Sequence, residues 1–210
     1  TTTYISDKKA AFTPKFGLDT PLFEHHTTSL VFNDPPLHTR VRRIMTSALT
    51  PKALARMEPG LIETVDHLLN IMPQHADLIE DFASTIPIQI IGNLLDVPME
   101  ERGPLRDWSL AILGALEPTL TEAQLLQGHT AVTEFKTYLQ DLIARRRSAP
   151  GDPETDVLTR LIAGDANGQL SEIELLHNCI FILNAGHETT TNLIGNGLAL
   201  LYDNPDQKEL

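Results

Sequence analysis

The chain has 210 residues, a formal net charge of −12 and a hydrophobic content of 41%. These values are ordinary for a globular protein, but the negative charge argues against non-specific binding to nucleic acid or to an anionic membrane surface. No apolar run approaches the roughly 18 residues that a spanning helix needs, so no membrane segment is predicted. The single cysteine, Cys179, excludes an internal disulfide and a multi-cysteine metal site. We therefore expect a cytoplasmic protein.

Residues 1–33 lack a long periodic apolar pattern and carry Pro14, Gly17 and Pro21, which predicts loops with a helical turn or two. The adjacent pair His25-His26 invites a metal site. Because no further ligands lie nearby in the sequence, we instead expect both histidines to be solvated on a loop.

The stretch 34–48 is predicted to be a helix, with Asp34 as its cap and Pro35 or Pro36 in its first turn. Its apolar residues recur at helical spacing; they are Leu37, Val41, Ile44, Met45 and Ala48.

His38 and Arg42 are four residues apart and so project from one face of that helix. Two interpretations are open for this face. It is either a solvated basic surface with Arg40 and Arg43 turned to water, or a site where His38 and Arg42 hold an anion between them.

The middle of the chain reads as further helices. We expect them at 50–57, 59–69, 82–95, 100–116, 121–147 and 156–163, joined by turns rich in proline and glycine. The run Arg145-Arg146-Arg147 lies at a predicted helix end, where three cations complement the helix dipole. No strand, repeat or low-complexity tract is evident, so the fold class is mainly α.

The stretch 170–203 is the dominant predicted element. Ser171 and Glu174 form a capping-box pattern at its start, and Pro205 ends it. A helix over 171–203 would be roughly 50 Å long at 1.5 Å per residue. Its apolar block 179–183 is expected to be buried on every side.

The next residues, 184–192, include a glycine and several β-branched residues that are poor choices for a helix interior. Such a local conflict is typical of a functional site. The Thr189 hydroxyl is expected to bond the carbonyl of Ala185, and Gly186 leaves that carbonyl unshielded. With the Glu188 carboxyl beside it, this groove would suit a small polar ligand and proton delivery to it.

Two other chemistries for this helix are rejected. His187-Glu188 begins a zinc-protease pattern, but Thr191 stands where the second histidine is required. Cys179 lies within the apolar block and is interpreted as a small buried hydrophobe.

The run from Ala185 to Thr190 resembles the oxygen-activation motif of the cytochromes P450, Ala/Gly-Gly-x-Asp/Glu-Thr-Thr/Ser. The run from Asp34 to Arg42 resembles a second motif of that family, Asp-Pro-Pro-x-His-x-x-x-Arg. Both stand in the family's order. The resemblance extends over nearly all of the chain but covers only part of the family, because the N-terminal sheet region, the Glu-x-x-Arg helix and the cysteine loop have no counterpart.

This resemblance implies a partial cytochrome P450 fold as a single domain over 1–210, belonging to a longer protein of the soluble bacterial type. It implies haem (heme, iron protoporphyrin IX) with its axial thiolate outside this chain and its propionates on His38 and Arg42. Glu188 and Thr189 would be the acid–alcohol pair that delivers protons, with Ala185, Gly186 and Thr189 beside the cofactor. The substrate-facing wall would comprise Leu30, Val31, Leu183 and Ala185.

The implied activity is that of a monooxygenase, which inserts one atom of O2 into an apolar small molecule and draws electrons from a ferredoxin or flavin reductase. Residues 113–121 would be the loop of a mobile lid over the substrate. The alternative is a catalytically inactive, truncated helical fragment that acts as a binding or assembly module.

Overall fold

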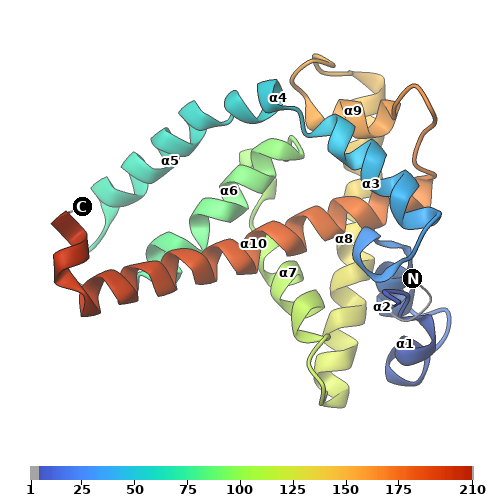
Figure 1. Cartoon of the computed structure of the whole chain (residues 1–210), viewed down its shortest axis with the longest axis horizontal. Coiled ribbons are helices and arrows are strands. Elements are labelled where there is room, and N and C mark those ends of the chain that lie inside the picture. The colour runs from blue at the N-terminus through green and yellow to red at the C-terminus, as the bar shows by residue number, and fades with distance from the viewer. Residues whose placement is uncertain (1–4, 210) are drawn as a thin grey trace.

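The computed structural model describes residues 5–209 and consists of helices and connecting turns, with no β-strand in that range (Figure 1). The mainly α class is therefore confirmed. The α-helices are α1 (Lys9–Phe16), α2 (Pro21–Thr28), α3 (Leu37–Ala48), α4 (Pro51–Ala55), α5 (Glu58–Ile71), α6 (Thr85–Leu94), α7 (Leu105–Gly114), α8 (Glu122–Ser148), α9 (Val157–Ala163) and α10 (Glu172–Asp203). Short 3-10 or π turns occupy Leu30–Phe32, Ile79–Ala83, Met99–Glu101 and Pro205–Glu209.

Helix α10 is 32 residues long and crosses the full width of the molecule (Figure 1). The predicted capping box is present, because the Ser171 hydroxyl accepts from the Glu174 amide and the Glu174 carboxylate accepts from the Ser171 amide. The apolar block is buried as expected, apart from Phe181, which is half-buried.

The core lies where α10 crosses α7 and α8. Helix α9 packs against α8, and α3 packs against α9. The largest fully buried side chains of the core include an aromatic ring from α8 and aliphatic residues from α7 to α10. They are Phe135, Leu139, Ile143, Leu105, Ile112, Leu158, Leu161, Leu175 and Ile180. Full burial of such a side chain contributes about 1.5–3 kcal/mol each, so this crossing fixes the position of the first half of α10.

The end of α8 is tied to three separate segments. Arg145 pairs with Glu101 at 2.8 Å, Arg146 with Asp156 at 2.8 Å and with Asp96, and Arg147 with Glu172 at 2.6 Å. The predicted dipole interaction is thus accompanied by specific ion pairs that join α8 to α9, to α10 and to the turns before α7.

The first 33 residues are more helical than expected. His25 and His26 lie on α2, not on a loop, and are 2% and 3% exposed, so the prediction that they are solvated was wrong. Their burial depends on α2 packing against α1, α8 and α10, which the local sequence does not reveal. Helix α2 is capped by Thr20, whose hydroxyl accepts from the Phe23 amide.

Asp34 does not cap α3, contrary to expectation. The helix begins one residue after Pro36 without a side-chain cap, and the peptide bond between Pro35 and Pro36 is cis. The Asp34 carboxylate instead accepts from the amides of Ser6 and Asp7. The predicted helix over 100–116 is also shorter, because α7 begins only after Pro104. No helix among the described residues is long and apolar enough to cross a membrane.

Candidate functional site

The segment Ala185–Thr190 lies midway along α10, where the helix leaves the core. The predicted bond is present, since the Thr189 hydroxyl donates to the carbonyl oxygen of Ala185 at 2.7 Å. Ala185, Glu188 and Thr189 are all exposed and lie on one face of the helix. A hydroxyl, a carboxyl and a small side chain are therefore presented together on an open surface.

Gly186 also leaves space for a side chain of α6. A Cβ atom on Gly186 would lie 2.8 Å from Cδ1 of Ile91, a distance too short for two carbon atoms. The missing side chain therefore leaves room for the end of the Ile91 side chain, which packs from α6 against α10. The carbonyl that Thr189 bonds belongs to Ala185, on the exposed side.

His187 points the opposite way from Glu188 and Thr189. Its side chain is buried, and its Nδ1 lies 3.1 Å from the hydroxyl oxygen of Ser109 on α7. Burial, and secondarily the charge of Arg106, lower the pKa of His187, so the imidazole is neutral at pH 7. The sequence assigned no role to this position.

A second group of polar residues surrounds a cavity of about 440 Å³ between the start of α3 and α10. His38 and Arg42 both line it, as their spacing predicted, together with Leu30, Val31 and Phe181. Neither the His38 nor the Arg42 side chain makes a hydrogen bond or ion pair with the residues that the structure describes. The Asp34 carboxylate also lines the cavity, and its pKa is lowered by hydrogen bonds from the Asp7 and Ser6 amides and, to a smaller extent, by His38. Two side-chain donors thus line this cavity without a hydrogen-bonded acceptor among the described residues.

The neighbouring arginines are not simply turned to water, as one interpretation had it. Arg40 pairs with Glu174, and Arg43 pairs with Asp165 at 2.7 Å. These contacts join α3 to the start of α10 and to the turn before it. Arg40 and Arg43 thus hold neighbouring elements together, whereas Arg42 forms no such pair with a described residue.

The residues expected on a substrate-facing wall are divided by the structure. Leu30 and Val31 line the cavity with His38, and Ala185 is exposed on α10. Leu183 is 0% exposed and belongs to the core, so it does not reach the open face of α10. The sequence could not show that Leu183 is buried and Ala185 exposed, because both lie near the end of the apolar block, where burial on every side gives way to burial on one face.

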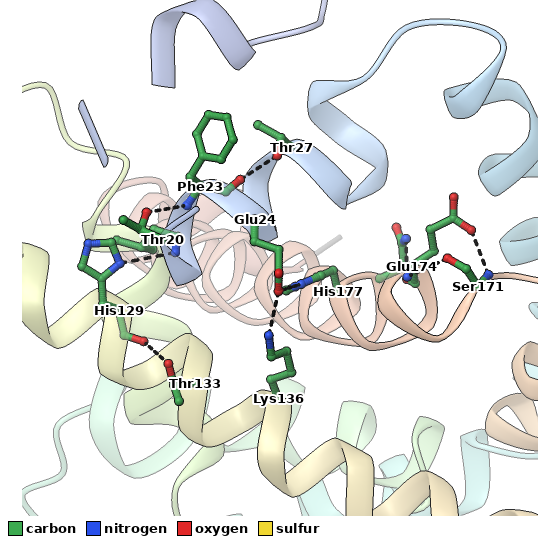
Figure 2. Close-up of polar contacts among 12 residues, drawn as sticks. Thr20, Phe23, Glu24, Thr27, His129, Thr133, Lys136, Ser171, Glu174 and His177 are labelled. Carbon is green, nitrogen blue, oxygen red and sulfur yellow. Dashed lines mark hydrogen bonds and ion pairs between the residues drawn. The ribbon is translucent and has the colours of Figure 1, made fainter. Parts of the chain in front are cut away.

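A polar cluster that sequence reasoning missed joins α2, α8 and α10 (Figure 2). Glu24 Oε1 lies 2.7 Å from Nζ of Lys136 and 2.8 Å from Nε2 of His177, which is fully buried. Burial raises the pKa of Glu24, but the bonds from Lys136 and His177 outweigh it and the net pKa is lowered. The His177 ring also lies 5.5 Å from the ring of His25.

Both motifs, on α3 and on α10, lie within the part of the chain that is similar to known proteins. The family model described as Cytochrome P450 matches residues 115–209. The biotin biosynthesis cytochrome P450 of Bacillus subtilis (strain 168) is 31% identical over 205 residues, which are 92% of this chain and 51% of that protein. The vitamin D(3) 25-hydroxylase of Pseudonocardia autotrophica is 36% identical over 188 residues, covering 88% of this chain and 44% of that protein. The chain belongs to the cytochrome P450 family.

The solved structures agree with that assignment. The crystal structure of CalO2 superposes with a TM-score of 0.86 at 28% identity, over 95% of this chain and 50% of that one. That of P450BioI, in complex with an acyl carrier protein carrying hexadec-9Z-enoic acid, gives 0.81 at 31% identity, over 89% and 48%. The partial P450 fold is therefore confirmed, and the P450 chain spans about half the length of the curated relatives it matches.

Cys179 is placed as the sequence interpretation expected. It is 0% exposed, and burial raises the pKa of its thiol to about 12. A thiol in this environment stays protonated and does not provide a thiolate ligand. Within this P450 chain it is a core residue.

Proposed function

We propose that this chain forms part of a haem-dependent monooxygenase, which inserts one oxygen atom of O2 into an apolar small molecule. The observation that carries the proposal is the Thr189 hydroxyl bonded to the Ala185 carbonyl at 2.7 Å, with the Glu188 carboxyl beside it on the same open face. The family's other motif supports it, because His38 and Arg42 converge on one cavity. Residues 1–210 would act as one domain of the larger protein.

The residues present fit the haem. The Arg42 guanidinium and the His38 imidazole line the cavity and make no hydrogen bond to a described residue, and such donors suit two carboxylates. They would hold the propionates, while Ala185 and Thr189 would lie beside the cofactor. When bound, the haem supplies the redox chemistry with dioxygen and electrons. Its axial thiolate is assigned to no residue of this chain.

Glu188 and Thr189 would manage protons at this site. The Thr189 hydroxyl donates its own proton to the Ala185 carbonyl, so its oxygen is free to accept another hydrogen bond. The Glu188 carboxyl is exposed and can exchange protons with solvent. A proton taken up at Glu188 would pass to the hydroxyl of Thr189 and then to the reacting oxygen.

The apolar substrate would contact Leu30, Val31 and Ala185. The turn 115–121 between α7 and α8 would belong to a lid, as the family resemblance implied. Electrons would come from a ferredoxin or flavin reductase.

Thr189→Ala in the whole protein tests the proton role. The product formed per reductant consumed should fall at least about 10-fold, since positioned proton donors contribute 10²- to 10⁴-fold, and hydrogen peroxide should rise correspondingly. The free energy of unfolding should change little, because Thr189 is exposed.

Thr190→Ala is the matched control, because it removes the same side chain one residue further along. It should leave the peroxide fraction near that of the wild type. Equal effects of the two substitutions, or none from Thr189→Ala, would show that Thr189 does not guide protons.

A further inference from the structure

His187 is the buried side chain within the segment Ala185–Thr190. Its neighbours Glu188 and Thr189 are exposed, whereas His187 is 2% exposed and directed at α7. Successive residues of a helix are rotated by about 100°, since 3.6 residues make one turn. The direction in which His187 is held therefore sets the direction in which the next two side chains project.

The polar contact that holds His187 is with Ser109. Its Nδ1 lies 3.1 Å from the hydroxyl oxygen of a serine that is 0% exposed, whereas its Nε2 is buried without a partner. An unpaired buried nitrogen is costly. The single bond on Nδ1 is therefore the specific polar restraint on this imidazole.

The other side of the motif is held by an apolar contact. Gly186 lets Ile91 of α6 approach closely, as described above. At this level α10 is thus clamped between α6, through Gly186, and α7, through His187 and Ser109. Helix α7 continues through the turn 115–121 into α8, and both contact α10. Movement of that pair would therefore change the position of Ser109 relative to His187.

We propose that His187 is a positioning residue, which through Ser109 couples the placement of α7 to the orientation of Glu188 and Thr189. This inference rests on the proposed monooxygenase function and deepens it. Closure of the α7–α8 lid over a substrate would bring the acid–alcohol pair into register, and a displaced α7 would leave it misaligned.

The test compares four variants of the whole protein with haem bound. His187→Leu and Ser109→Ala each remove the bond from one side, and the double variant removes both partners. His187→Asn keeps a polar group near the position of Nδ1. Thr191→Val is the matched control, because Thr191 is also buried on α10 and bonds the His187 carbonyl at 3.0 Å, one turn further along.

Two readouts are made. The first is the fraction of reductant that appears as hydrogen peroxide, with kcat and KM for product measured separately. The second is amide hydrogen exchange over residues 183–192, measured without turnover.

His187→Leu and Ser109→Ala should each raise the peroxide fraction and lower kcat about 3- to 10-fold, with KM nearly unchanged. The double variant should be no worse than either single variant, and His187→Asn should recover most of the coupling. Exchange over 183–192 should rise in both single variants. Thr191→Val should lower the unfolding midpoint without changing the peroxide fraction.

An unchanged peroxide fraction in both single variants would overturn the proposal, as would additive losses in the double variant or an equal loss in Thr191→Val. If the wild type forms no oxygenated product at all, the proposed function itself fails. The exchange data would still report whether Ser109 and His187 fix this part of α10, so the two failures are distinguishable.

Discussion

Single residues determine how closely the helices of this molecule approach one another. Arg102 is 8% exposed, yet its guanidinium forms no ion pair with a carboxylate among residues 5–209. Its hydrogens are donated to the carbonyl oxygens of Val97 and Gln89 and to the side-chain oxygens of Gln89 and Asn93. It fits against α6 because Gly92 has no side chain, since a Cβ there would lie 2.5 Å from Nε of Arg102.

Gly92→Ala should therefore destabilise the fold. The new methyl group would displace the guanidinium and break several of its bonds, and a buried charged group left unpaired costs about 2–4 kcal/mol. Chemical denaturation should show this loss in the free energy of unfolding. Gly103→Ala is the control, because a Cβ at Gly103 meets nothing within 4 Å. It should shift stability by less than about 0.5 kcal/mol, and similar losses in both variants would contradict this account.

Residue-level predictions from sequence held where the partner was local. The Thr189–Ala185 bond spans four residues and follows from helix geometry. Asp34 was assigned to the wrong partner, because its carboxylate meets amides 27 and 28 residues away. His25 and His26 were misplaced for the same reason, since only the docking of other helices buries them.

At the scale of elements, α2 is held by a group of titratable side chains. Glu24 bonds Lys136 of α8 and His177 of α10 (Figure 2). The ring of His25 lies against that of His177. His26 packs among Phe12, Phe16 and Phe32. Burial lowers the pKa of His26 to about 3 and that of His25 well below its ordinary value.

These shifts predict that α2 makes the fold sensitive to acid. Below pH 6.5, the ordinary histidine pKa, these histidines are protonated in the unfolded chain but stay neutral in the folded one. The free energy of unfolding is therefore at its full value above about pH 6.5 and decreases as the pH falls below it. His26 stays neutral at about pH 4.5, and this lowers the free energy of unfolding by about 2–3 kcal/mol relative to pH 7. His26→Phe should abolish one such contribution and keep the aromatic packing.

The measurement is the free energy of unfolding between pH 7 and pH 4.5. His75→Gln is the control, because His75 is exposed and its replacement should leave the slope unchanged. An unchanged slope in His26→Phe would refute the assignment.

Several elements could be predicted from sequence because their start signals are local. Ser171 caps α10 as expected. The helices predicted to begin at 50, 121 and 156 do so, and Thr50, Thr121 and Asp156 each cap the helix that follows. Helix α1 was missed because Pro14 lies inside it. Helix α1 packs against α2, and this tertiary contact cannot be predicted from the residues of the segment itself.

At the scale of the molecule, burial is uneven. The crossing of α7, α8 and α10 holds most of the core, whereas α5 has Leu68 as its only buried residue and exposes Ile62 and Ile71 at 54% and 62%. The last turns of α10 likewise expose Leu193 and Leu200. Figure 1 shows α5 and this end of α10 on the side of the molecule away from α8.

Amide hydrogen exchange should reveal this difference in the 210-residue chain. Amides of α8 and of residues 174–184 should be protected at least about 100-fold more than those of α5 and residues 193–203, because opening a poorly buried helix costs little. Uniform protection along α10 would contradict the expectation. Lys substitution at Ile62 offers a check, since it should leave the protection of α8 unaltered.

The three arginines at the end of α8 give the molecule an unusual relation to ionic strength. Added salt screens the partly exposed ion pairs of Arg145 with Glu101 and of Arg147 with Glu172 and so weakens the junctions that they hold. The same salt screens the mutual repulsion within a chain of net charge −12, which favours compactness. Because these contributions have opposite signs, they partly cancel, and the stability of the fold should depend on salt less strongly than the number of ion pairs would suggest.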